Sequence, residues 1–216
     1  HNGIMVDQIL KHPLLNGWNL FWLITGSISV LSFWELAQAN LQEPEDINAL
    51  IRFSVRASVP WLLLAFGAST LVYLWPSDWT RWNLRNRRIL GLSFTAVMMW
   101  QLVFIGIMLV VHGWEYFITT VSPPSDLAIR IFAYGVIAAL TVTSFDWGRK
   151  LLSLRQWKIL HSTGIYLLWL APWTTYVGMI ALGHFSFFAV FYGTWSTVII
   201  VLKLYVVYAK RQRQLA

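Results

Sequence analysis

The feature that most constrains this chain is a series of six long apolar runs. They lie at approximately 18–34, 54–75, 89–111, 127–144, 159–180 and 185–208. A helix needs about 20 apolar residues to cross roughly 30 Å of hydrocarbon. The runs are continuous and show no alternation of polar and apolar residues, which favours helices over a β-barrel. We therefore predict an all-α fold, a six-transmembrane-helix bundle that forms one domain over residues 1–216.

The composition agrees with this prediction and excludes other classes of protein. The chain is 57% hydrophobic and 12% charged, whereas soluble domains carry about 25% charged residues. A water-soluble enzyme and a disordered chain are therefore excluded. Because the chain has no cysteine, disulfides, thiolate metal sites and cysteine-bound iron–sulfur clusters are excluded as well. The sequence also lacks the glycine-rich motifs that hold a dinucleotide or a triphosphate.

The basic residues predict the orientation of the bundle. Lysine and arginine concentrate in cytoplasmic loops. With both termini in the cytoplasm, thirteen of the sixteen basic residues lie on the cytoplasmic side and three, Arg52, Arg56 and Arg130, on the outer side. The net charge of +7 is thereby explained by topology and by contact with anionic lipid headgroups. We expect the lipid bilayer as partner and no nucleic acid.

Loops and tryptophans complete the predicted topology. The two longest loops are expected on the outer side, at 38–51 and 112–126. Tryptophan favours the membrane–water interface, so the tryptophans that flank the cytoplasmic loops are expected to be interface anchors. These are Trp75, Trp79, Trp82, Trp147 and Trp157. Pro172, inside the fifth run, is expected to kink its helix.

Polar residues at membrane depth are the candidates for chemistry, because they are costly there. Gln101 lies in the middle of the third run, and His161 lies one turn inside the fifth. His112 and His184 are expected at the outer ends of the third and fifth helices. For each of these residues a structural role, as a hydrogen-bonding or interfacial side chain, is the alternative.

Two segments resemble the ferric reductase-like transmembrane domain family. Residues 85–92, RNRRILGL, resemble the basic loop that precedes the third helix of that family. Residues 143–169, TSFDWGRKLLSLRQWKILHSTGIYLLW, resemble its connection into the fifth helix, where the pattern W-x-x-L-H precedes an apolar run. The closest similarity is to the bacterial heme-binding membrane subunits of methionine sulfoxide reductase systems. This resemblance implies a multi-pass protein of the bacterial inner (plasma) membrane.

The resemblance also implies a cofactor. Members of the family carry b-type heme between helices three and five and pass electrons across the membrane. They have a histidine about fourteen residues after the paired arginines, and two histidines thirteen residues apart in the fifth helix. In this chain only His161 matches, because Gln101 and Thr174 stand at the other two positions. Neither glutamine nor threonine is a usual axial ligand of heme iron.

Two interpretations follow. In the first, the chain is an electron-transfer subunit, a possible oxidoreductase component, in which His161 binds heme b iron and His112 with His184 forms an outer pair. Arg52 and Arg56 would then hold the heme propionates, or else extend to lipid phosphates. A separate flavoprotein or a quinol would supply electrons. In the second, the chain is a heme-free structural or partner-binding membrane subunit, in which Gln101 and Thr174 hydrogen-bond each other.

Overall fold

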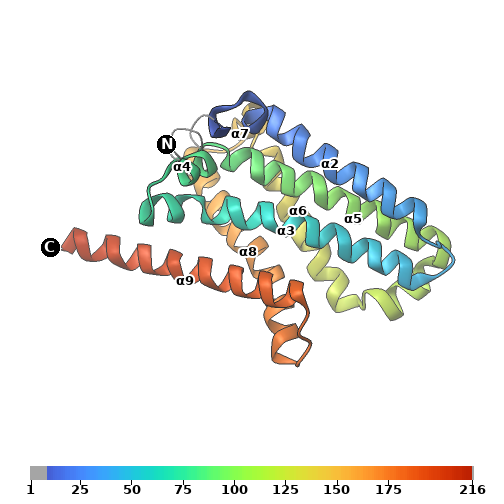
Figure 1. The fold of residues 1–216 in the computed structure, drawn as a ribbon. Coiled ribbons are helices and arrows are strands. Elements are labelled where there is room, and N and C mark those ends of the chain that lie inside the picture. Colours follow the sequence, from blue (N-terminus) through green and yellow to red (C-terminus); the bar gives the residue numbers. More distant parts are fainter. Residues whose placement is uncertain (1–8, 216) are drawn as a thin grey trace. The chain divides into compact units, whose positions relative to one another are not determined.

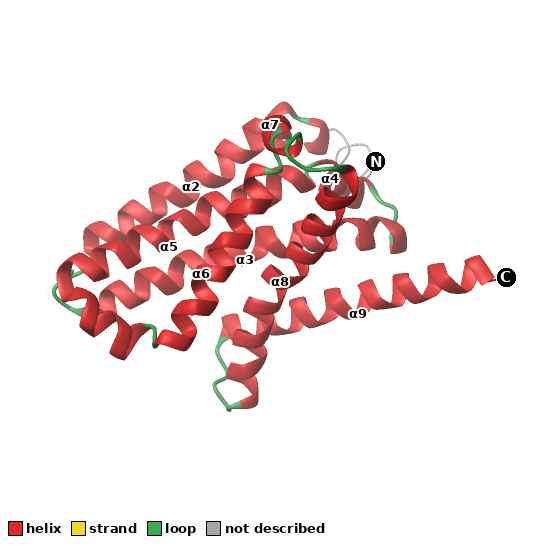
Figure 2. Cartoon of the chain, turned by 180° about the vertical axis from the view of Figure 1, so that it is seen from behind, coloured by secondary structure: helices red, strands yellow, loops and turns green. Residues whose placement is uncertain are grey.

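The structure is a computed structural model that describes residues 9–215, and these residues fold almost entirely into helices (Figure 1). The described residues contain no strand, as Figure 2 shows, so the predicted all-α class is confirmed. The helices are η1 (Pro13–Leu15), α2 (Gly17–Gln38), α3 (Pro44–Leu74), α4 (Asp78–Arg85), α5 (Arg87–Tyr116), the π-helix η2 (Phe117–Val121), α6 (Pro124–Val142), α7 (Asp146–Arg149), α8 (Leu154–Ala181) and α9 (Phe187–Leu215).

Six of these helices are long and apolar enough to cross a membrane: α2, α3, α5 continued by η2, α6, α8 and α9. The prediction of six spans is confirmed, and the chain is a multi-pass membrane protein by this measure. The last span is longer than predicted, since α9 continues past the basic residues Lys210, Arg211 and Arg213 to Leu215. Both termini in the cytoplasm stays a prediction from the charge pattern.

The second span begins earlier than the sequence suggested, so the expected loop over 38–51 is wrong. Only residues 39–43 separate α2 from α3. Pro44 occupies the first position of α3, where its missing N–H costs nothing, and Glu45 and Asp46 stand in the first turn, where carboxylates interact favourably with the helix dipole. Ile47 is fully buried, which gives this first turn an apolar anchor.

The chain packs as two compact units. Of the described residues, unit 1 comprises 9–21, 59–91 and 169–215, and unit 2 comprises 22–58 and 92–168. Four helices, α2, α3, α5 and α8, therefore contribute one part to each unit. Residues 1–8 and 216 of the predicted single domain lie outside the described range, and the prediction of one domain stays a prediction.

In unit 1 the short helix α4 is held by polar contacts. Asn83 donates to the Leu64 carbonyl at 3.1 Å, and the Trp82 indole donates to the Leu15 carbonyl at 2.7 Å. Trp82 is only 9% exposed, so its predicted role as an interface anchor is wrong. Its indole N–H has a protein partner inside unit 1, whereas Trp75, on the preceding loop, is 55% exposed.

A row of aromatic rings joins α3, α8 and α9 within unit 1. The rings of Phe66 and Trp169 stack at 5.6 Å, and Trp169 stacks on Trp173 at the same centroid distance. On α9, Lys203 places its ammonium 4.3 Å from the Phe66 ring and donates to the Phe66 carbonyl at 3.0 Å. The Trp169 indole donates to the Ser196 carbonyl. These contacts attach α9 to both other helices.

Unit 2 combines an apolar core with hydrogen bonds between helices. The helices α2 and α5 lie side by side in both views (Figures 1 and 2), and the Trp100 indole donates to Ser29 between them at 3.0 Å. Thr95 and Thr141 join α5 to α6, also at 3.0 Å. The core consists of residues from α3, α5 and η2: Ile47, Leu50, Ile51, Phe104, Met108 and Phe117.

The C-terminal end of α5 is interrupted at Gly113. Its φ of 81° and ψ of 166° lie outside the helical region, in a conformation that glycine adopts without steric cost. The chain then continues into the π-helix η2, whose Phe117 is buried. The predicted outer loop at 112–126 is therefore mostly helical. Because of this interruption, His112 does not share a continuous α-helix with the residues after Gly113.

Gly148, in α7, gives the first testable prediction. A Cβ atom built on this buried glycine would collide with the backbone carbonyl of Val142 at the end of α6. Since a backbone atom cannot move aside as a side chain can, we expect Gly148→Ala to destabilise the protein by about 1–3 kcal/mol. Unfolding in mixed micelles measures this loss. The matched variant Gly135→Ala, on α6, meets no atom within 4 Å and should leave stability unchanged.

Candidate functional site

The candidate site is the set of polar contacts around His161, on the part of α8 that belongs to unit 2. The His161 Nε2 lies 2.9 Å from the Thr143 hydroxyl at the end of α6. The His161 ring packs on Trp157 with their centroids 4.5 Å apart. Trp157 in turn donates from its indole to the Thr143 carbonyl at 3.0 Å. These three residues thus hold the start of α8 against the end of α6.

The contacts of Thr143 predict which nitrogen of His161 carries a hydrogen. The Thr143 hydroxyl has one hydrogen and lies 2.6 Å from the Ala139 carbonyl, to which it donates. With its hydrogen used there, Thr143 accepts from His161, so we predict the tautomer of His161 that has its hydrogen on Nε2. A nitrogen that binds iron must instead present its lone pair.

Gln101 occupies the position where the similar family has its third-helix histidine. It is 5% exposed and lies in the middle of α5. The Tyr134 hydroxyl, on α6, donates to the Gln101 Oε1 at 2.5 Å. This bond satisfies a buried amide oxygen that would otherwise be costly at membrane depth. Gln101 therefore joins α5 to α6.

Thr174 stands at the last of the family's ligand positions, and it lies in unit 1. Its side chain is exposed, and its hydroxyl donates to the Leu170 and Ala171 carbonyls of its own helix, both at 3.0 Å. Gln101 belongs to unit 2, so the expected hydrogen bond between Gln101 and Thr174 stays a prediction. Nearby, Thr175 also donates to the Ala171 carbonyl, so neither hydroxyl compensates the carbonyl that Pro172 leaves free.

His112 is the second histidine of unit 2. Its Nε2 lies 3.1 Å from the Leu41 carbonyl in the short connection between α2 and α3. Because a carbonyl can only accept, this nitrogen also carries a hydrogen. The ring lies 5.5 Å from that of Tyr116. His112 therefore joins the C-terminal end of α5 to the turn between α2 and α3.

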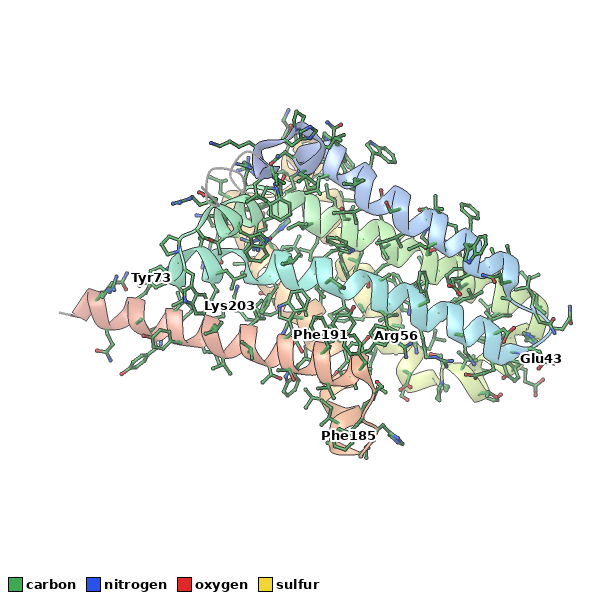
Figure 3. The ribbon with its side chains drawn as sticks, in the orientation of Figure 1. Glu43, Arg56, Tyr73, Phe185, Phe191 and Lys203 are labelled. Atoms are coloured by element: carbon green, nitrogen blue, oxygen red, sulfur yellow. The ribbon has the colours of Figure 1, made fainter. Side chains whose placement is uncertain are left out.

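The remaining candidates are dispersed. His184 is exposed and lies in unit 1, where Gly183, with φ 82°, ends the turn after α8. His112 and His184 thus belong to different units. Arg52 is exposed and forms an ion pair with Glu45 at 2.6 Å. Arg56 is half-buried on the same helix, α3 (Figure 3).

The Nε2 atoms of both histidines of unit 2 lie within hydrogen-bond distance of protein oxygens, the Leu41 carbonyl for His112 and the Thr143 hydroxyl for His161. Gln101 is already bonded to Tyr134. Within residues 9–215 there is also no group of three or more histidine, aspartate or glutamate side chains that could hold a metal ion. What the arrangement does is join neighbouring helices through hydrogen bonds.

Sequence reasoning missed the partners of the site residues. The sequence gives no expectation for Tyr134 or Thr143, and it predicts for Trp157 an interface anchor and the first position of the pattern W-x-x-L-H. Thr143 directly follows α6 and Trp157 lies in the first turn of α8, both within the segment that the resemblance covers. A signal for Tyr134 was its phenol at membrane depth, because a buried phenol usually finds a hydrogen-bond partner.

Comparisons with known proteins add nothing to this geometry: no protein-family model, no curated protein and no solved structure matches the chain. The functional argument therefore rests on the contacts themselves.

The bond between Gln101 and Tyr134 gives the second prediction. We expect Tyr134→Phe and Gln101→Leu each to destabilise the protein by about 1–2 kcal/mol, since each leaves a buried polar group unpaired. The double variant should cost less than the sum, because it removes both polar groups together. A double-mutant cycle of unfolding in mixed micelles measures this coupling, about 0.6 kcal/mol for typical membrane pairs. Strictly additive losses would contradict the bond.

Proposed function

We propose that this chain is a heme-free structural membrane subunit that keeps the bundle of the ferric reductase-like transmembrane class. The observation that carries the proposal is the hydrogen bond from the Nε2 of His161 to Thr143. This residue is the one that matches the family's ligand pattern, and its Nε2 serves the packing of α8 on α6. Gln101, bonded to Tyr134, supports the same interpretation.

In this role the side chains hold helices together without a cofactor. A hydrogen bond between helices in a membrane contributes modestly, about 0.6 kcal/mol on average. Contacts of this kind join the helices of unit 2, and they include those from Ser29, Ser58, Thr95, Gln101 and His161 to residues of a neighbouring helix or its end. Acting together, they fix which faces of the helices meet. The subunit is then a rigid membrane scaffold.

One helix of unit 2 offers a surface for a partner subunit. Only 6% of the apolar stretch of α6 is buried, the smallest share among the six spans. Ile129, Ile131 and Phe132 are each more than 60% exposed. Such a face contacts lipid or the helix of another membrane protein. The proposed subunit would use it for assembly in the membrane.

The resemblance favours a second function, membrane electron transfer through b-type heme with electrons from a flavoprotein or a quinol. The observation in its favour is that His161 follows the pattern W-x-x-L-H. An absorption spectrum separates the two functions. We expect protein purified from heme-supplemented cells to show no Soret band, while a b-type cytochrome produced in the same cells shows one. A Soret band that shifts on dithionite reduction and disappears in His161→Ala would establish electron transfer instead.

A further inference from the structure

The end of α3 in unit 1 carries a polar group that the scaffold does not use. The hydroxyl of Tyr73 is buried and has no hydrogen-bond partner among the residues that the structure describes. A buried hydroxyl without a partner costs free energy, so an unpaired one in a folded protein calls for an explanation. Figure 3 shows Tyr73 at the end of α3, beside the C-terminal half of α9.

Two cations of α9 lie over the same side chain. The Lys210 ammonium is 4.8 Å from the centre of the Tyr73 ring, and the Arg213 guanidinium carbon is 6.0 Å from it. Lys210 and Arg213 are three residues apart, hence on one face of the helix. Among the residues that the structure describes, neither forms an ion pair with a carboxylate. Two cations therefore lie over the ring that carries the unpaired hydroxyl.

We propose that Tyr73, Lys210 and Arg213 form a binding site for the phosphate group of an anionic phospholipid. A phosphate oxygen accepts from a phenol hydroxyl and from ammonium or guanidinium donors, and arginine suits it especially well. Because the Tyr73 hydroxyl is buried, binding requires the side chains that cover it to move aside. The ligand would then supply the partner that the Tyr73 hydroxyl lacks.

The position of the site favours a lipid over a free phosphate ion. Tyr73 is the penultimate residue of α3, which is one of the six membrane-spanning helices. The exposed Trp75 follows directly, and tryptophan favours the depth of the headgroups. Each lysine or arginine near the membrane surface raises the affinity for anionic lipid by about five-fold. The site thus lies where lipid phosphates are.

The test uses the full-length protein and native mass spectrometry, with phosphatidylglycerol and phosphatidylcholine supplied in equal amounts. We expect the wild type to retain phosphatidylglycerol preferentially. Arg213→Gln should weaken this retention about five-fold, whereas Arg211→Gln, with the same change of charge two residues away, should not. Tyr73→Phe should also weaken it, and Tyr208→Phe should not. For each variant, a melting temperature in phosphatidylcholine alone that equals that of the wild type shows that the protein is folded. If Arg213→Gln does not fold, Arg213→Lys replaces it as a milder variant.

Three results would overturn the proposal. If Arg211→Gln and Arg213→Gln weakened the retention of phosphatidylglycerol equally, the overall charge of α9 would attract the lipid and there would be no defined site. Wild-type retention in Tyr73→Phe would mean that the hydroxyl is not a ligand. Displacement of phosphatidylglycerol by an equal concentration of inorganic phosphate would mean that the site takes the free ion.

Discussion

Replacing Trp169 by alanine is expected to cause the largest loss of stability in this protein, about 3–5 kcal/mol. Trp169 is 8% exposed and lies between the rings of Phe66 and Trp173. Its indole also donates to the Ser196 carbonyl on α9 at 3.1 Å. The variant therefore leaves a large cavity where three helices of unit 1 meet, and it removes a hydrogen bond. Reversible unfolding in mixed micelles measures the change.

Two variants separate the contributions of Trp169. Trp169→Phe keeps a stacked ring and loses the indole N–H, so we expect it to recover most of the stability. Trp34→Ala removes a tryptophan of α2 that is 63% exposed and should change stability by less than about 0.5 kcal/mol. If Trp169→Ala destabilised the protein no more than Trp34→Ala does, the aromatic row would have no structural role.

The second large effect is expected at His161, where alanine should cost about 2–4 kcal/mol. The variant removes the ring that packs on Trp157, and it removes the donor to Thr143. Both losses weaken the junction between α6 and α8, and the buried hydroxyl of Thr143 loses the group that donates to it. Unfolding in mixed micelles is again the measurement, performed without added heme.

Conservative variants divide this loss into packing and hydrogen bonding. His161→Phe keeps an aromatic ring against Trp157 and loses the N–H, whereas Thr143→Val removes the acceptor and keeps the shape. We expect each to cost about 1–3 kcal/mol, less than His161→Ala. His184→Ala, at an exposed turn of unit 1, should be neutral. Stability that falls in His161→Ala but recovers fully on adding heme would contradict the scaffold role.

The six spans could be predicted because the signal for a membrane helix is local. Length and apolar character within about 20 residues suffice, and the helices appear where these runs lie. The start of α3 could not be placed by hydropathy alone, since Glu45 and Asp46 look like loop residues until the helix dipole is considered. Hydropathy therefore predicts a loop where the polar first turn of α3 lies.

The site could be predicted only in part, for a different physical reason. His161 and Gln101 stand out because polar residues are costly at membrane depth. Their partners are set by the packing of helices, which brings together residues 18 and 33 positions apart in the chain. No spacing rule within one helix reaches that far. The sequence could therefore name the polar residues but not the bonds that decide what they do.

The proton on the Nε2 of His161 is the most direct test of the heme-free scaffold. We would label the histidines with ¹⁵N, record solid-state NMR spectra of the protein in lipid bilayers and assign the His161 signals by their loss in His161→Gln. The hydrogen bond to Thr143 predicts a protonated Nε2 whose signal shifts in Thr143→Val. An unprotonated Nε2, with its lone pair open to a ligand and insensitive to Thr143→Val, would contradict the account.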